Sequence, residues 1–176
     1  MNMNNVIIRQ EHECDYEQVF KVVKMAFENE EFSDKDEHNL VERLRKSEAF
    51  VPELSVVAEI AGKIVGHILF TEITIGGEIA LALAPVSVSP DYQGLGIGAK
   101  LIKAGHEVAG TLGYKAIVLL GHEGYYPRFG YVKASLYGIE APFDVPDESF
   151  MVLELKENSL EEFNGIVEYA PEFFQA

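Results

Sequence analysis

The sequence is poor in cysteine, in positive charge and in long hydrophobic runs, and each shortage excludes a class of protein. A single cysteine, Cys14, excludes an internal disulfide framework, so a reducing cytoplasm is the expected location. No apolar stretch approaches the roughly 18–20 residues that a membrane helix needs. The N-terminus, MNMNNVIIRQ, lacks the basic start and the cleavage site of a secretory signal. We therefore expect a cytoplasmic protein that does not enter a membrane.

Positive charge is scarce as well, because 14 Lys and Arg stand against 29 Asp and Glu, for a net charge of −15. This balance argues against a nucleic-acid partner, since such binding depends on cations that neutralise phosphates. Residues 1–90 and 134–176 are strongly acidic, whereas residues 91–133 hold five basic and three acidic side chains. That stretch leaves local room for an anion. Chance clustering among so few residues is the alternative.

The rest of the composition is that of a globular chain long enough for a sizeable core, with 48% hydrophobic residues. Periodicity predicts two helices after a first strand, and a further helix over 101–112. Gly76-Gly77 suits a tight antiparallel hairpin, and the apolar strand 116–120 after the third helix predicts a right-handed crossover with two parallel strands. The strands are expected at residues 6–10, 55–60, 64–75, 79–88, 116–120 and, as the last one, 150–155.

The strand before the third helix changes its alternation at Pro85. The larger apolar residues stand at odd positions up to Leu83 and at even positions, Val86 and Val88, beyond the proline. Because strand side chains alternate strictly, this change predicts a bulge that re-aims the strand. The alternative is that the alanines at positions 80, 82 and 84 make both faces apolar, so that the change has no meaning.

A glycine-rich loop, in SVSPDYQGLGIGAKLI at residues 87–102, follows this strand directly and leads into a helix. Such a loop presents unpaired N–H groups at the positive end of the helix dipole, and its glycines let a phosphate approach the backbone. Three cations, Lys100, Lys103 and Arg128, are near in sequence. The candidate pyrophosphate cradle consists of Gln93, Gly94, Leu95, Gly96, Ile97, Gly98 and Ala99.

Three phosphate-binding motifs compete for this loop. A Walker loop needs Gly-Lys-Ser/Thr at its end, and here Gly98 is followed by Ala99. Residues 94–99 satisfy the dinucleotide motif G-x-G-x-x-G/A, but that motif usually opens a series of βαβ units, and here four hairpin-joined strands precede it. A nicotinamide or flavin oxidoreductase is therefore the less favoured alternative. The third motif, Gln-x-x-Gly-x-Gly, is matched by Gln93, Gly96 and Gly98.

With that motif, and with Tyr-x-x-x-Gly-aromatic at residues 126–131, the sequence resembles the GNAT superfamily of N-acetyltransferases. EHNLVERLR and YYPRFGYV are similar to a bacterial subgroup whose members mostly lack assigned substrates. The resemblance implies an α/β fold with a central mixed, mostly antiparallel sheet of about seven strands. Helices would flank the sheet, and one parallel strand pair would be splayed at the acyl-CoA site. We expect a single domain over 1–176, with a family core at about 6–135 and a C-terminal strand plus acidic tail at 136–176.

The resemblance implies an acyltransferase that moves the acetyl group of acetyl-CoA to a primary amine, by direct attack in a ternary complex. The amine would belong to a small molecule or to a protein, and the acidic surface favours a cationic one. The cradle would hold the pyrophosphate, and the bulged strand would pair with the pantetheine arm. Besides the cradle, the implied acetyl-CoA contacts are Val86, Ser87, Val88, Lys100, Gly121, Tyr126 and Phe129.

Tyr126 is implied as the general acid that protonates the departing thiolate, with an aromatic plug beside Tyr125 and Phe129 as the alternative. Glu72, inside the long strand next to the expected slot, is the candidate general base. Other candidates stay open: His67 on the opposite strand face, His122, Glu123, Glu30, Glu31, or a chain of water molecules.

No histidine spacing matches a motif such as H-E-x-x-H, so no metal is expected. Homodimerisation through residues 136–176 stays open. The rival from another class is a non-catalytic protein that binds or senses CoA or acyl-CoA, with the cradle kept and the chemistry lost.

Overall fold

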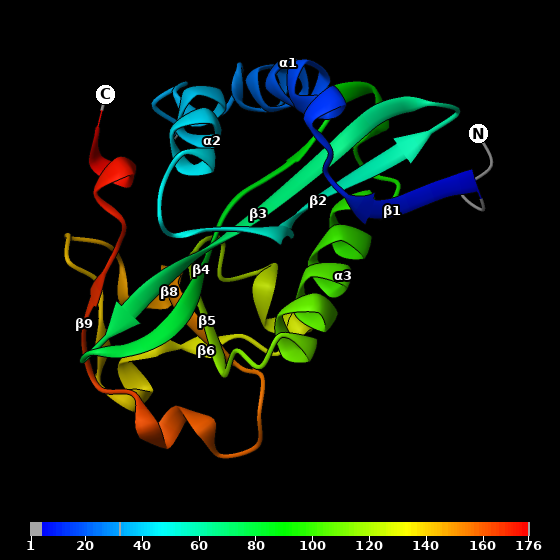
Figure 1. Cartoon of the computed structure of the whole chain (residues 1–176). Coiled ribbons are helices and arrows are strands. Elements are labelled where there is room, and N and C mark those ends of the chain that lie inside the picture. Colours follow the sequence, from blue (N-terminus) through cyan, green and yellow to red (C-terminus); the bar gives the residue numbers. More distant parts are fainter. Residues whose placement is uncertain (1–4, 32, 176) are drawn as a thin grey trace.

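The computed structural model describes residues 5–31 and 33–175, and its centre is one mixed sheet (Figure 1). The main path of the sheet has the order β1-β2-β3-β4-β5-β8-β6, with β7 and β9 off this path. This confirms the expected mixed, mostly antiparallel sheet. The strands are β1 (Val6–Gln10), β2 (Phe50–Ile60), β3 (Lys63–Ile75), β4 (Glu78–Val88), β5 (Ala116–Leu120), β6 (Val132–Lys133), β7 (Ile139–Glu140), β8 (Phe150–Glu154) and β9 (Gly165–Glu168).

Three helices cover the sheet, α1 (Tyr16–Phe27) and α2 (Glu37–Arg45) on one face and α3 (Ile97–Thr111) on the other (Figure 1). Each helix buries a stripe of apolar side chains at helical spacing. On α1 this stripe includes Val19, Val22 and Val23. Between the sheet and α3 lies the largest apolar cluster, and a separate cluster lies under α1 and α2. No helix among the described residues is long and apolar enough to cross a membrane.

The turn between β3 and β4 is the expected two-residue hairpin. Gly76 and Gly77 have φ of +58° and +89°, a region that favours glycine. The expected bulge in β4 is also present. Ile68 pairs with Val86 and Phe70 pairs with Leu83, so three steps on β4 oppose two on β3.

The parallel pair of β4 and β5 is short, and this shortness positions the site. The two strands pair at Leu81–Ile117 and Ala82–Val118 and then separate. Beyond that point the Val86–Val88 segment of β4 pairs with β3 on one edge. On its other edge it has no strand partner among the described residues. The expected splayed pair is therefore confirmed.

Two expectations about strands were wrong. β2 begins at Phe50 rather than near 55, because a register shift between Phe50 and Ser55 leaves Pro52 outside the ladder. Residues 150–154 do form a strand, β8, but it is not the last one. β9 follows it and pairs with the far end of β3, where Thr74 lies opposite Glu168.

Candidate active site

The loop between β4 and α3 brings unpaired helix N–H groups to the end of the bulged strand. The side-chain amide of Gln93 donates to the carbonyl oxygen of Val88 at 3.1 Å, which ties the loop to the strand. The first backbone bond of α3 runs from the N–H of Lys100 to the oxygen of Gly96 at 3.1 Å. The N–H groups of residues 97–99 precede this bond and are available to an anion.

The three positions of the loop that hold glycine do so for different physical reasons. Gly94 and Gly96 have φ of +78° and +81°, so their backbone requires glycine. Gly98 has no such φ, and a Cβ added to it would meet Tyr125 Oη at 3.6 Å and Val88 Cγ2 at 3.8 Å, which are ordinary contacts. Neither strain nor internal packing requires Gly98. Its bare backbone keeps the helix N-terminus open to a ligand.

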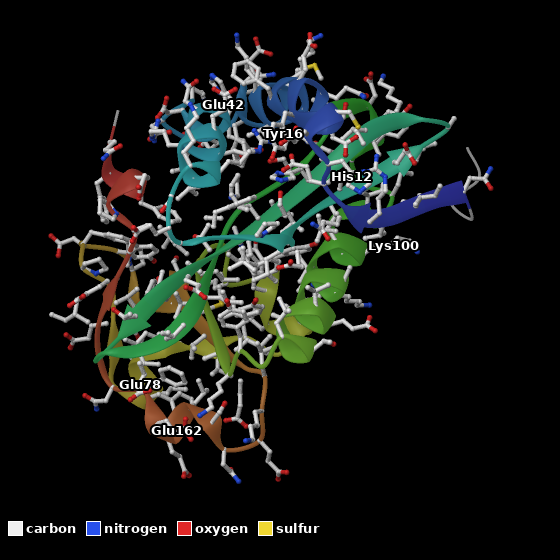
Figure 2. All side chains as sticks on the ribbon, viewed as in Figure 1. His12, Tyr16, Glu42, Glu78, Lys100 and Glu162 are labelled. Atoms are coloured by element: carbon white, nitrogen blue, oxygen red, sulfur yellow. The ribbon has the colours of Figure 1, made fainter. Side chains whose placement is uncertain are left out.

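A cavity of about 620 Å³ lies over this loop and carries the positive charge that the sequence places here. Lys103 and Arg128 line it, whereas Lys100 lies on α3 without lining it. Acidic side chains such as Glu42 on α2, Glu78 at the start of β4 and Glu162 lie on other parts of the molecule (Figure 2). The cavity is lined by Val88, Tyr92, Gln93, Gly94, Gly96, Ile97, Gly98, Ala99, Lys103, Tyr125, Arg128 and Phe129.

Arg128 is held at the cavity by the loop after β5. Its guanidinium donates to the carbonyl oxygens of Tyr125 at 2.9 Å and Gly124 at 3.3 Å, and lies 4.7 Å from the centre of the Tyr125 ring. These bonds fix the charge without neutralising it, since neither acceptor is a carboxylate. Arg128 can therefore attract an anion into the cavity.

Tyr126 lies deeper, beside the gap between β4 and β5. A Cβ on Gly121, which follows β5, would overlap the Tyr126 ring, so glycine at 121 makes room for the phenol. Burial raises the pKa of Tyr126 to about 12, with a smaller contribution from Tyr125. The phenol is therefore protonated at neutral pH and can act as a proton donor.

Behind Tyr126 lies a second aromatic pair. The Tyr131 ring meets Tyr126 edge-on with centroids 5.9 Å apart, and the Tyr131 hydroxyl is 2.8 Å from Nε2 of His106 on α3. Burial lowers the pKa of His106 to about 4, so this imidazole is neutral at neutral pH.

Glu72 is placed away from this group. It lies opposite Leu81, five residues before Val86, or roughly 15 Å along an extended strand. Its carboxylate accepts a hydrogen bond from the hydroxyl of Tyr114, just beyond α3. Its contacts are those of a residue that joins β3 to the end of α3.

The other candidate bases lie apart from one another. His67 is fully buried under α1 and α2, where Nε2 is 2.9 Å from the hydroxyl of Ser55, and burial lowers its pKa to about 4. Nδ1 of His122 accepts from the N–H of Gly124 at 3.0 Å and so stabilises the loop. The remaining three, Glu123, Glu30 and Glu31, are exposed.

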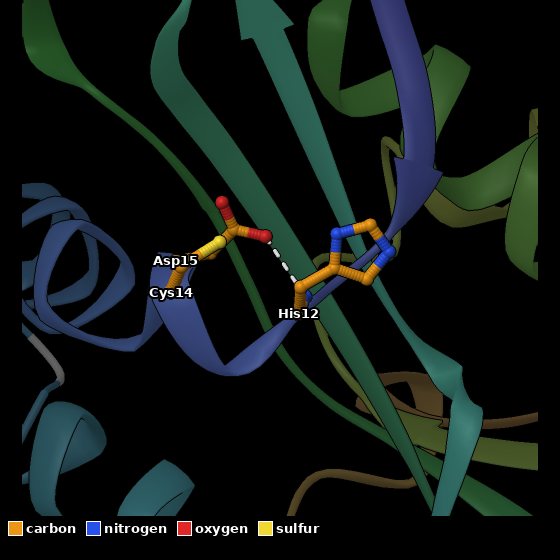
Figure 3. A group of neighbouring side chains, drawn as sticks. All are labelled: His12, Cys14 and Asp15. Atoms are coloured by element: carbon orange, nitrogen blue, oxygen red, sulfur yellow. Dashed lines mark hydrogen bonds between the residues drawn. The ribbon is translucent and has the colours of Figure 1, made fainter.

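His12, Cys14 and Asp15 bring possible metal-ligand atoms within 4.8 Å of one another. Both carboxylate oxygens of Asp15, however, accept hydrogen bonds from Arg9, at 2.7 and 2.9 Å. One of them also accepts from the backbone N–H of His12 at 2.8 Å (Figure 3). This carboxylate is occupied by a cation of the protein itself.

The cavity brings together most of the expected cradle, together with Val88 and Phe129. Leu95 and Lys100 are nearby without lining it, and Gly121 and Tyr126 lie at the gap behind it. Sequence reasoning did not include Tyr92, Lys103 and Tyr125 among the contacts. Position beside Tyr126 was the available signal for Tyr125, and position one helical turn after Ala99 was the signal for Lys103.

The fold and the site together define a class of protein in which two parallel strands of a mixed sheet separate beside a helix N-terminus. The cavity there has space for a ligand that carries phosphate. Residues 9–131 match the acetyltransferase (GNAT) family. The uncharacterized N-acetyltransferase YjhQ of Escherichia coli K12 is 41% identical over 126 residues, which cover 69% of this chain and 70% of YjhQ. The chain therefore belongs to the GNAT family of acetyltransferases, and the expected acyltransferase class is confirmed.

Solved structures agree over nearly the whole chain. YhbS from Escherichia coli, in complex with CoA, superposes with a TM-score of 0.88 at 26% identity, over 97% of this chain and 93% of that one. A GNAT family acetyltransferase from Brucella melitensis, in complex with acetyl-CoA, has a TM-score of 0.80 at 34% identity, with 96% and 97% covered. The similarity to both extends beyond residue 135, into the segment that sequence reasoning left outside the family core.

Proposed function

We propose that this enzyme transfers the acetyl group of acetyl-CoA to a primary amine, which attacks the thioester directly in a ternary complex. The observation that carries the proposal is the continuity of two features. The open edge of β4 at Val86–Val88 leads directly to the free N–H groups of residues 97–99. An extended pantetheine arm can pair with the former, and a pyrophosphate can bind to the latter.

The side chains around the gap support an assignment of roles. Tyr126 supplies the proton that the departing thiolate takes, because its hydroxyl is protonated at neutral pH and its ring packs against Gly121, at the end of β5. A backbone N–H of the Val86–Val88 segment stabilises the oxyanion on the thioester oxygen. Lys103 and Arg128 attract the phosphates on a protein whose net charge otherwise repels them.

The proposal for the general base is Glu72, and its contacts make this assignment easy to test. If Glu72 accepts the proton of the amine, Glu72→Gln lowers kcat by about 100-fold or more. If it serves only to hold Tyr114, kcat stays within about twofold, and the variant loses stability of the order of 1 kcal/mol, as for one hydrogen bond.

Thermal unfolding with acetyl-CoA, CoA, NAD and FAD, each added separately, tests the donor. A ligand at 100 times its Kd adds about 2.7 kcal/mol, which raises Tm by several degrees at about 2–4 °C per kcal/mol. We expect a rise with acetyl-CoA and CoA and none with NAD or FAD. A rise with a dinucleotide alone would contradict the proposal.

A screen of primary amines with acetyl-CoA then tests the transfer. It should include polyamines, aminoglycosides and lysine peptides, since the acidic surface favours cations. Formation of an N-acetyl product supports the proposal. Binding of acetyl-CoA without any product across the screen would support the non-catalytic CoA-binding alternative. Homodimerisation is a further prediction, which sedimentation equilibrium decides.

A further inference from the structure

The first strand of the sheet has an open edge. β1 pairs with β2 and with no other strand of the described chain, so it ends the sheet beside α3 (Figure 1). The N–H of Glu11 donates to the oxygen of Ser55 on β2 at 2.8 Å. Because the backbone groups of a strand alternate between its two edges, the N–H groups of Ile8 and Gln10 point away from β2. The carbonyl of Ile8 points the same way, whereas that of Gln10 accepts from the Arg9 guanidinium at 3.0 Å.

The sequence of β1 does little to block this edge. Edge strands are usually protected by proline, by a free charge such as lysine, or by a covering segment. β1 reads VIIRQ, with three consecutive apolar residues. Its one cation is used within the protein, since Arg9 donates to Asp15 at 2.7 and 2.9 Å and to Glu59 at 3.4 Å. Ile7 is 53% exposed. Such an apolar edge is suited to pairing with another chain.

A groove of about 440 Å³ lies beside β1, between the sheet and α3. A strand added to β1 would point every second side chain to the α3 face of the sheet, where the groove lies. Leu112, directly after α3, is 44% exposed at the groove. One extended chain can therefore use both the open edge and the groove. The apolar part of the lining consists of Ile8, Val56, Ala104, Val108 and Leu112.

The charges of the groove indicate what kind of chain fits. Glu53 on β2 and Glu107 on α3 line it with exposed side chains, and within residues 5–31 and 33–175 neither forms an ion pair. Arg9, the cation of the lining, is already paired with two carboxylates. A second copy of this chain would bring the same carboxylates and a net charge of −15, so like charges oppose it. Basic side chains would be attracted instead.

We propose that an extended peptide with apolar and basic side chains docks here by adding a strand to β1. Its backbone pairs with Ile8 and with the N–H of Gln10, and its apolar side chains fill the groove beside α3. Its basic side chains meet Glu53 and Glu107. This groove shares no lining residue with the cavity at the start of α3, so the proposal does not rest on acetyl transfer.

Two capped, fluorescently labelled peptides test the chemistry of the partner. The first is Lys-Thr-Val-Thr-Val-Thr-Lys, which places its lysines and valines on one face of a strand, and the second has glutamate in place of lysine. We expect the lysine peptide to bind at least about 10-fold more tightly at low salt, as measured by fluorescence anisotropy. Equal affinities, or no binding of the lysine peptide at millimolar concentration, would overturn the proposal.

Single substitutions locate the bound peptide. Glu53→Gln and Glu107→Gln should each weaken binding by roughly two- to fivefold at low salt, since each removes one charge at the groove. Glu42, an exposed carboxylate on α2, provides the matched control, and Glu42→Gln should leave the Kd unchanged (Figure 2). If all three variants bind alike, the net charge of the protein holds the peptide, and the proposed groove is wrong.

Hydrogen exchange of the β1 amides distinguishes strand addition from looser binding. With saturating lysine peptide, the N–H of Ile8 should exchange at least about 5-fold more slowly, whereas that of Arg9, which faces β2, should not change. A lysine peptide N-methylated at every second residue should give no protection. An unchanged rate at Ile8 would contradict strand addition. Protection of Ile8 that grows with protein concentration, without any peptide, would overturn the proposal and assign the edge to a second copy.

Discussion

The two halves of β4 differ in their neighbours. Leu81 and Ala82 lie between β3 and β5 and are buried. Among the residues that the structure describes, Val86 and Val88, beyond the bulge, pair only with β3, and they are partly exposed. Both halves belong to one strand and one hairpin. The lower half holds the sheet together, and the upper half borders the cradle. The candidate site therefore lies where strand pairing stops, because the backbone N–H and C=O groups at that edge of β4 are free to bind a ligand.

Substitution in the lower half should give the largest effect, and on stability alone. Leu81→Ala removes a fully buried side chain between the sheet and α3 and should destabilise the fold by about 2–5 kcal/mol. Urea unfolding measures this, and the Kd of CoA for the folded protein should stay within about twofold. A Kd that weakens in proportion to the lost stability would mean that the two halves are not separable.

The next effect belongs to the gap beside the upper half, in the loop after β5, and should appear in catalysis alone. Tyr126→Phe removes the proposed acid and should lower kcat by about 100-fold or more. Tm and the KM of acetyl-CoA should change little, because the ring that packs beside Gly121 is kept. Steady-state kinetics with an amine from the screen measures the effect. Turnover equal to that of the wild type would remove Tyr126 from the acid role.

A pair of glycine substitutions on α3 should separate binding from stability. Gly98→Ala and Gly110→Ala should each raise stability by up to about 1 kcal/mol, since alanine favours helix and neither Cβ meets a close contact. Only Gly98→Ala should weaken CoA binding, by about 10-fold or 1.4 kcal/mol, because its methyl group occupies the approach of the pyrophosphate. Calorimetric titration measures both. Equal affinities of the two variants would contradict the cradle.

The smallest effect concerns long-range charge. Lys103→Gln should weaken CoA binding by roughly two- to fivefold at low salt, and the loss should shrink as ionic strength rises. Lys24, an exposed cation on α1, provides the control, and Lys24→Gln should leave the Kd unchanged. A loss that persists at high salt would indicate a direct contact rather than screening.

Local signals allowed the centre of the fold to be predicted. The Gly76-Gly77 turn and the change of alternation at Pro85 each involve residues that are adjacent in sequence. Their physical causes, a positive φ and strict alternation, can be read without knowing any distant neighbour. The third helix was expected over 101–112, but α3 begins at Ile97, because the glycine loop itself forms its first turn. The candidate cradle was predicted from local signals of the same kind, and its role as a phosphate site stays a prediction.

What could not be predicted depends on pairs that are distant in sequence. β8 inserts between β5 and β6, and β9 returns to β3, because of packing that no local pattern encodes. The hydrogen-bond partner of Glu72 is Tyr114, which is 42 residues away in the sequence. The partner of His106 is Tyr131, which is 25 residues away. A carboxylate in a strand carries no local mark of whether it meets a substrate or a tyrosine.

The return of β9 has a consequence for synthesis of the chain. Thr74 and Ile75 pair with β9, about 90 residues further along the chain. At usual elongation rates this edge of β3 waits roughly 5–20 seconds for its partner to be made. An unpaired edge strand can pair with other chains in that interval. Slow translation of the segment before residue 165 would therefore favour aggregation of the nascent protein, although the finished fold covers that edge.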